Sequence, residues 1–187
     1  VSRHVFDVIA LLKRRGLYVG LITNGILVRD KLPDLLRVRP DHVSVSVNAV
    51  SEEKYRALVD TKPGDFDRVL EAVRLLSPHV KTYASYVSTK QNWRDIPAFC
   101  ELAANQGAHV ITIVNLLPNI SDTYERAKDF WDFVITEEDT KIIDAINGFK
   151  TGLIGSNRRY KGANLVAVWP RPISRTACPS TCDSPFV

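Results

Sequence analysis

Helical and strand-like patterns alternate along most of this chain of 187 residues, and this alternation limits its fold more than any other feature. Apolar residues recur at helical spacing over 5–12, and the short apolar run at 17–22 is typical of a buried strand. Further strands are expected over 42–48, 80–88 and 109–115, with helices between them. Strands separated by helices pair in parallel. The sequence therefore predicts an α/β fold, either a barrel or a doubly wound sheet.

The segment 42–48 gives the clearest strand pattern, because its side chains alternate between valine and polar residues. Its valines must point to one face of the sheet, and Ser44, Ser46 and Asn48 to the other. Since valine suits the layer beneath the helices, we expect the polar row to line the inner side of the sheet. Buried hydroxyls need hydrogen-bond partners, so this row either bonds to neighbouring strands or faces a ligand.

Two polar residues are expected to begin helices. Asn92 follows the third strand and can cap a helix that carries Cys100 on its apolar side. Thr136 precedes three acidic residues, which the positive end of a helix dipole favours. Cys100 is expected to be a small core residue, because it lies among the apolar positions of its helix.

Composition excludes several classes of partner. The formal net charge is +4, but lysine and arginine are spread along the chain, whereas nucleic-acid binding needs clustered cations. No apolar run reaches the ~20 residues that cross a bilayer, so no membrane partner is expected. Three cysteines without a visible signal peptide favour a reducing compartment, and the expected location is cytoplasmic.

Polar or turn-forming residues follow each expected strand, at the end where parallel sheets and barrels bind ligands. They carry no paired carboxylates, no Ser-His-Asp set and no HExxH motif, and no glycine-rich phosphate loop follows a strand. Hydroxyls and amides can hold a ligand, but a cofactor would have to supply the difficult chemistry. The four segments are 23–25, 46–48, 88–92 and 115–118.

The order of these strand ends resembles the radical S-adenosylmethionine (radical SAM) superfamily. A strand ends in T-N-G at 23–25, the next ends in S-V-N at 46–48, and the last ends just before Pro118. This order is similar to strands three to six of the radical SAM partial barrel. The resemblance runs over about residues 3–118 and again over 178–187. It implies an incomplete (βα) barrel with parallel strands and outer helices.

The resemblance also implies two cofactors. In this family a [4Fe-4S] cluster cleaves S-adenosylmethionine to a 5′-deoxyadenosyl radical, which would here modify a peptide or small-molecule substrate. Ser46 matches a serine that contacts the cofactor's ribose, and Asn48 stands where the family usually has an aspartate. Leu117 matches the residue that supports the adenine. The full set of cofactor-binding residues expected from the resemblance is Thr23, Asn24, Ser46, Asn48, Asn115 and Leu117.

The largest departure from the family is the CxxxCxxC loop that binds the main cluster, which is absent from this chain. The chain also opens at Val1 with a helix pattern and holds no methionine, so we expect a fragment. The full-length protein would then be an enzyme, and the fragment alone would be inactive.

Cys178 and Cys182 lie four residues apart in a segment rich in Pro, Ser and Thr. By resemblance they would bind metal, at the start of a SPASM-like extension that holds auxiliary clusters. The alternative is that they are two free thiols or form a disulfide. The expected division is a partial barrel at 1–170 and the start of the extension at 171–187.

Two alternatives remain open. The chain could be a non-catalytic βα scaffold or binding module that has lost the cluster loop, and an uncovered barrel edge would let it associate with itself. It could also be a phosphate-binding barrel, which would need a late glycine-rich loop. Its late glycines fit no known phosphate motif; they are Gly148, Gly152, Gly155 and Gly162.

Overall fold

The computed structural model describes residues 4–116, 129–154, 159–160 and 163–166. Its strands form a single sheet in the order β1-β2-β3-β4-β6-β5. All neighbouring strands are parallel except β5 and β6, which pair antiparallel. The strands are β1 (Gly20–Thr23), β2 (His42–Ser46), β3 (Lys81–Ser88), β4 (Val110–Asn115), β5 (Arg159–Tyr160) and β6 (Ala163–Val166). The parallel α/β sheet expected from the alternating patterns is thus confirmed.

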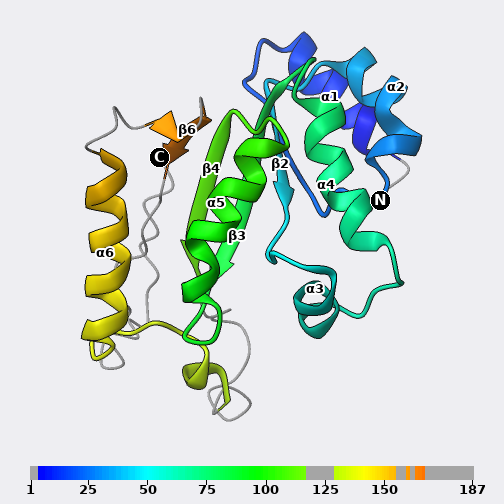
Figure 1. The fold of residues 1–187 in the computed structure, drawn as a ribbon. Coiled ribbons are helices and arrows are strands. Elements are labelled where there is room, and N and C mark those ends of the chain that lie inside the picture. Colours follow the sequence, from blue (N-terminus) through cyan, green and yellow to red (C-terminus); the bar gives the residue numbers. More distant parts are fainter. Residues whose placement is uncertain (1–3, 117–128, 155–158, 161–162, 167–187) are drawn as a thin grey trace.

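Helices connect the parallel strands, and α4 and α5 pack directly on β2, β3 and β4 (Figure 1). α1 packs against α2 beside the first strand. The helices are α1 (Val5–Arg14), α2 (Val28–Val38), α3 (Glu52–Leu58), α4 (Asp65–Leu76), α5 (Ile96–Asn105) and α6 (Thr140–Ile154), with short 3₁₀ turns η1 (Trp93–Asp95) and η2 (Asp129–Asp132). In the part of the chain that the structure describes, none of these helices has the length and apolar character needed to cross a membrane.

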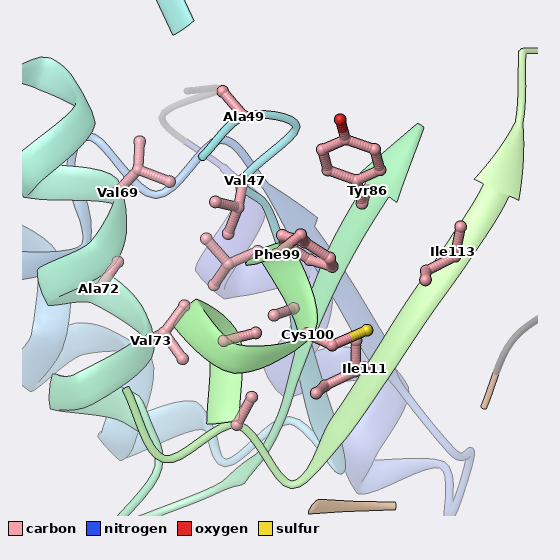
Figure 2. Close-up of a cluster of buried hydrophobic side chains, with 14 of the residues drawn as sticks. Val47, Ala49, Val69, Ala72, Val73, Tyr86, Phe99, Cys100, Ile111 and Ile113 are labelled. Carbon is pink, nitrogen blue, oxygen red and sulfur yellow. The ribbon is translucent and has the colours of Figure 1, made fainter. Parts of the chain in front are cut away.

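The core lies between the sheet and helices α4 and α5. Every valine of the alternating segment is buried there, and Val47 gathers with Val69, Val73 and Phe99 (Figure 2). Burying a side chain of this size contributes about 1.5–3 kcal/mol, so the three valines fix which face of β2 points to the helices. The predicted orientation of the valine row is confirmed, and Ser44 and Ser46 of the polar row face the other way. Asn48 follows the end of the strand and has a left-handed backbone conformation.

The T-N-G turn after β1 needs glycine for two reasons. Gly25 has a φ of 83°, a left-handed conformation that side chains rarely adopt. A Cβ at this position would also lie 3.0 Å from Val45 Cγ1 and 3.1 Å from Ala72 Cβ. The turn therefore presses closely on both β2 and α4.

Both expected helix starts differ from the structure. The side chain of Asn92 does not cap a helix, because its Oδ1 accepts from Thr89 N (2.7 Å) and its Nδ2 donates to Val87 O (3.0 Å). Asn92 closes the turn after β3 instead. Helix α6 begins at Thr140 rather than near Thr136. Residues 136–139 form a turn before it, in which Asp139 Oδ2 accepts from both the backbone N and the Oγ1 of Thr136.

Candidate functional site

A row of hydroxyl side chains crosses the middle of the sheet. Ser46 of β2 is in register with Ser85 of β3, and Ser85 is in register with Thr112 of β4. Residues in register on parallel strands share a face, and neighbouring strands lie about 4.8 Å apart. We call Ser46, Ser85 and Thr112 the hydroxyl row. It lies on the inner face, the side of the sheet opposite the helix-covered core.

The hydroxyl row is accessible to a ligand. Its three side chains are half-buried, and among the described residues none of their hydroxyls has a hydrogen-bond partner. Of the polar row predicted from the sequence, Asn48 does bond to the neighbouring strand, whereas among the described residues the hydroxyls of Ser44 and Ser46 do not. Sequence reasoning named Ser46 but missed Ser85 and Thr112, which could have been found by extending the alternation to the next two strands, β3 and β4.

Asn48 ties the loop after β2 to the next strand. Its φ of 56° is left-handed, which asparagine tolerates better than most residues. Its Oδ1 accepts from Val87 N at 3.0 Å, and its own N donates to Ser85 O at 3.3 Å. An aspartate oxygen could accept the same bond from Val87, so asparagine here keeps the bond and removes a negative charge.

A hollow of about 170 Å³ lies beside Asn48, at the carboxyl end of the strands. Lys54 and Asp95 line it and form an ion pair, with Lys54 Nζ at 2.6 Å from Asp95 Oδ1. Tyr86 also lines the hollow and donates its hydroxyl to Asn92 O at 3.1 Å. Lys54 and Asp95, the charged residues that line this hollow, are thus already paired with each other.

Thr23 and Asn24 lie at the carboxyl end of β1 and hold the turn there. Thr23 Oγ1 accepts from Gly25 N at 3.1 Å, and Asn24 Oδ1 accepts from Ile26 N at 3.4 Å. Asn24 is exposed, at the same end of the sheet as Asn48. Their local hydrogen bonds explain the turn, and their contact with a cofactor stays a prediction.

Asn115, at the carboxyl end of β4, has one free acceptor. Its side chain is buried on the helix-covered side, where its Nδ2 donates to Ile135 O at 3.0 Å. Its Oδ1 is buried without a hydrogen-bond partner among the described residues. A buried acceptor left without a donor is costly, and among the described residues this oxygen has none.

Residues 133–139 form a strap that is tied to the loop after β3. Lys90 N donates to Phe133 O at 2.8 Å, and Lys90 Nζ lies 3.0 Å from Asp139 Oδ2. Burial would raise the pKa of Asp139, but hydrogen bonds from Thr136 and Lys90 outweigh it and hold this pKa below its ordinary value. The strap is therefore fixed by a charged carboxylate.

At the amino end of the inner face, His42 lies between two tyrosines, with its ring tilted against both. The ring centroid of His42 lies 5.6 Å from that of Tyr18 and 4.8 Å from that of Tyr83. The imidazole covers Gly20, where a Cβ would come within van der Waals overlap of the ring. Burial first, and then the charge of Lys81, lower the pKa of His42. The neutral imidazole of His42 therefore covers the amino end of the inner face.

The remaining predictions concern residues that would bind a cofactor or a metal. Leu117, Cys178 and Cys182 lie outside the described residues. Within the described residues no group of three or more His, Cys, Asp or Glu side chains could hold a metal ion. Cys100 is buried in the core, and burial raises the pKa of its thiol to about 12, so it is a core residue as expected.

The site therefore offers neutral hydrogen-bonding groups rather than acids or bases. Hydroxyls and amide oxygens can orient a ligand, but none of them can be a strong general base at neutral pH. This agrees with the expectation from the sequence that the chemistry belongs to a cofactor.

Residues 2–103 match the model of the radical SAM superfamily. A curated relative, the probable GTP 3′,8-cyclase of Saccharolobus islandicus, is 29% identical over 121 residues, or 63% of this chain and 39% of the relative. The probable GTP 3′,8-cyclase of Methanocaldococcus jannaschii is 27% identical over 130 residues, 63% of this chain and 43% of the relative. The match thus spans well under half of the length of these relatives.

Two solved structures share the fold. SuiB of Streptococcus suis matches with a TM-score of 0.64 at 14% identity, over 90% of this chain and 36% of SuiB. The structure of anSMEcpe with bound AdoMet matches with a TM-score of 0.62 at 17% identity, over 88% of this chain and 44% of that protein. At such identities the likeness concerns the fold alone, and it confirms the incomplete (βα) barrel expected from the sequence.

Proposed function

Because this chain belongs to the radical SAM superfamily, we propose that it forms the S-adenosylmethionine-binding side of a radical SAM enzyme. The family implies S-adenosylmethionine and a [4Fe-4S] cluster as cofactors. The observation that carries the proposal is the hydroxyl row, whose hydroxyls lie on the inner face of the partial barrel and have no hydrogen-bond partner among the described residues. The activity of the whole protein is part of the proposal.

The residues at the carboxyl ends of the strands fit a nucleoside. Ser46 has a hydroxyl without a partner among the described residues, and this hydroxyl would bind a ribose hydroxyl. Asn115 lies at the carboxyl end of β4 with its side chain on the helix-covered side, and its contact with the cofactor stays a prediction. Thr23, Asn24 and Asn48 would border the same ligand. Leu117, outside the described residues, keeps its predicted place beside the adenine. The described residues thus supply donors and acceptors for the neutral part of S-adenosylmethionine.

The described residues do not fit the cluster. They hold no group of candidate thiolate or imidazole ligands, and Cys100 is buried and protonated. We therefore derive no reaction step through a cluster from this structure. Cluster binding by Cys178 and Cys182, the SPASM-like extension and the division after residue 170 stay predictions from the sequence, as does the cytoplasmic location.

When both cofactors are bound, the family's chemistry is the formation of a 5′-deoxyadenosyl radical. This chain's own contribution would be to orient the ligand and to limit water around it. The hydroxyls orient the ligand by hydrogen bonds, and Val87 and Val114, one step further along the same face, present apolar surface. We propose a peptide or small-molecule substrate, and no turnover by the 187-residue chain alone.

Both kinds of substrate have some support among the relatives. SuiB has been solved bound to its precursor peptide SuiA, and this chain matches that complex with a TM-score of 0.61 at 13% identity, over 87% of this chain and 34% of SuiB. The curated relatives are named for GTP.

Calorimetric titration of the chain with S-adenosylhomocysteine tests the proposal without needing turnover. We expect binding that Ser46→Ala weakens by about three- to tenfold, the value of one hydrogen bond. Thr151→Ala is the matched control, because it also removes a hydroxyl but lies on the exposed side of α6. Absence of binding, or an equal effect of the two substitutions, would contradict the proposal.

A binding module that associates with itself is the second candidate. β1 is the edge of the described sheet, and its Ile22 is 76% exposed beside an apolar hollow of about 240 Å³. An exposed apolar edge strand favours pairing with another chain. Sedimentation velocity tests this: a dimer that Ile22→Lys converts to a monomer would support it, and a monomeric wild-type chain would reject it.

A further inference from the structure

The inner face is almost free of charge around the hydroxyl row. Among the described residues of β1 to β4 that share this face, the row has Ser44 and Tyr83 on one side and Val87 and Val114 on the other. Within the described residues of β1 to β4, the charged side chain of this face is Lys81, at the amino end of β3. Lys81 lies four residues from Ser85, a distance of roughly 13 Å along a strand. Arg159 of β5, two strands beyond β4, is in register with Asn164 and through it with Val110.

Neutral hydroxyls select ligands by charge. A hydroxyl can both donate and accept a hydrogen bond, so it pairs well with amides, sugars and other neutral groups that also do both. An anion such as a triphosphate needs cations or several convergent backbone N–H groups to replace the water it loses. The hydroxyl row supplies neither. The Lys54–Asp95 pair beside Asn48 offers no free cation, because each charge neutralises the other.

We propose that Ser85 and Thr112 determine specificity: beside Ser46, which the proposed function assigns to the cofactor, they bind a neutral, hydrogen-bonding part of the substrate and disfavour an anionic group there. This inference deepens the proposed function and rests on it. It separates this chain from an enzyme whose triphosphate lies on the inner face, although its curated relatives are named for GTP. The neutral group can come from a nucleoside or from a peptide amide, since both combine donors with acceptors.

A pair of probes with the same base and sugar isolates the effect of charge. Guanosine and GTP differ only in the triphosphate, and an acetylated, amidated tripeptide of glycine and serine represents the peptide source. Each probe is titrated into the chain and followed by ligand-observed NMR, which detects weak binding. S-adenosylhomocysteine is titrated in parallel, so that failure of the proposed function is seen separately.

Two substitutions remove single hydroxyls, and one control keeps the hydroxyl. Ser85→Ala deletes the central hydroxyl, and Thr112→Val replaces a hydroxyl by a methyl of similar shape. Thr112→Ser keeps the hydroxyl. We expect Ser85→Ala and Thr112→Val each to lower the affinity for the neutral probe by about three- to tenfold. Thr112→Ser should retain binding. Far-ultraviolet circular dichroism checks that each variant folds.

The outcomes are distinct. Binding of guanosine or of the tripeptide that depends on Ser85 and Thr112 supports the inference, and the probe that binds identifies the source of the neutral group. Tighter binding of GTP than of guanosine overturns it, and so does the absence of binding by both neutral probes. If the neutral probes fail while S-adenosylhomocysteine binds, the inference falls and the proposed function stands.

Discussion

Asn48 and Val87 are joined by a hydrogen bond of 3.0 Å from the backbone N of Val87 to the side-chain Oδ1 of Asn48. This bond fixes the loop after β2 to the carboxyl end of β3, where the inner face opens. A neutral amide makes it in a conformation with a φ of 56°. The geometry of the candidate site therefore depends on this acceptor.

Replacing Asn48 separates its role as acceptor from its charge. Asn48→Asp keeps an oxygen for Val87 N and should change the free energy of unfolding by less than about 1 kcal/mol. Asn48→Ala loses the bond and puts alanine at a positive φ, which should cost about 2–3 kcal/mol. Urea denaturation measures both variants. Equal destabilisation by the two substitutions would show that the acceptor does not matter.

Gly25 should tolerate a side chain less well than Gly64, although both have a positive φ. A Cβ at Gly25 would press on Val45 and Ala72, whereas at Gly64 it would meet nothing within 4 Å. Gly64→Ala should therefore cost about 1 kcal/mol for conformation alone, and Gly25→Ala about 2–4 kcal/mol, because the contacts add to it. Thermal and urea unfolding of the matched pair give the difference, and a difference near zero would contradict the close packing of the turn.

His42 should make the folded chain less stable in mild acid. Its pKa is lowered from 6.5 in the folded state, mainly by burial and then by Lys81, with Asp41 acting in the opposite direction. The unfolded chain therefore binds a proton more readily. The contribution of His42 to stability is complete above about pH 6.5 and is lost as the pH falls below it.

The measurement is urea unfolding at pH 8 and at pH 5.5 for the wild-type chain and His42→Phe. The groups that face the ring are Tyr18, Tyr83, Lys81 and Asp41, and none has an ordinary pKa inside this window. We expect the wild-type chain to lose more stability than His42→Phe between the two values. The same loss in both would exclude His42 as the cause.

The strap should loosen when Asp139 is replaced. Asp139→Ala removes the acceptor of two bonds from Thr136 and the partner of Lys90, and should cost about 1–3 kcal/mol. Lys90→Met should cost less, because the hydrogen bonds between Asp139 and Thr136 remain. A double-mutant cycle with urea unfolding should give a coupling of about 0.5–1 kcal/mol. Strictly additive effects would show that the two charges do not interact.

Local patterns in the sequence predicted the fold well where the burial of apolar side chains outweighed other preferences. The alternation of valine with polar residues at 42–48 fixed the two faces of β2, because burying the valines outweighs any competing preference. The parallel sheet and the core place of Cys100 followed from similar periodicity. These features depend on neighbours in the sequence, so a single segment contains enough information to identify them.

The candidate site was harder to predict because it depends on register between distant segments. Ser85 and Thr112 join Ser46 only through the pairing of three strands, and no segment taken alone shows that they meet. Asn92 was expected to cap a helix, but its amide is satisfied by its own turn. Competition between equivalent local hydrogen bonds is decided by the surrounding structure.

The backbone and the side chain of Ser85 have different roles. Its carbonyl oxygen accepts from Val47 N at 3.0 Å and from Asn48 N at 3.3 Å, so it anchors the loop after β2 through atoms that every residue type possesses. Its side chain can therefore vary without loss of that anchor. Homologous chains could acquire a new ligand preference at this position through a single codon change, with the barrel mouth left intact.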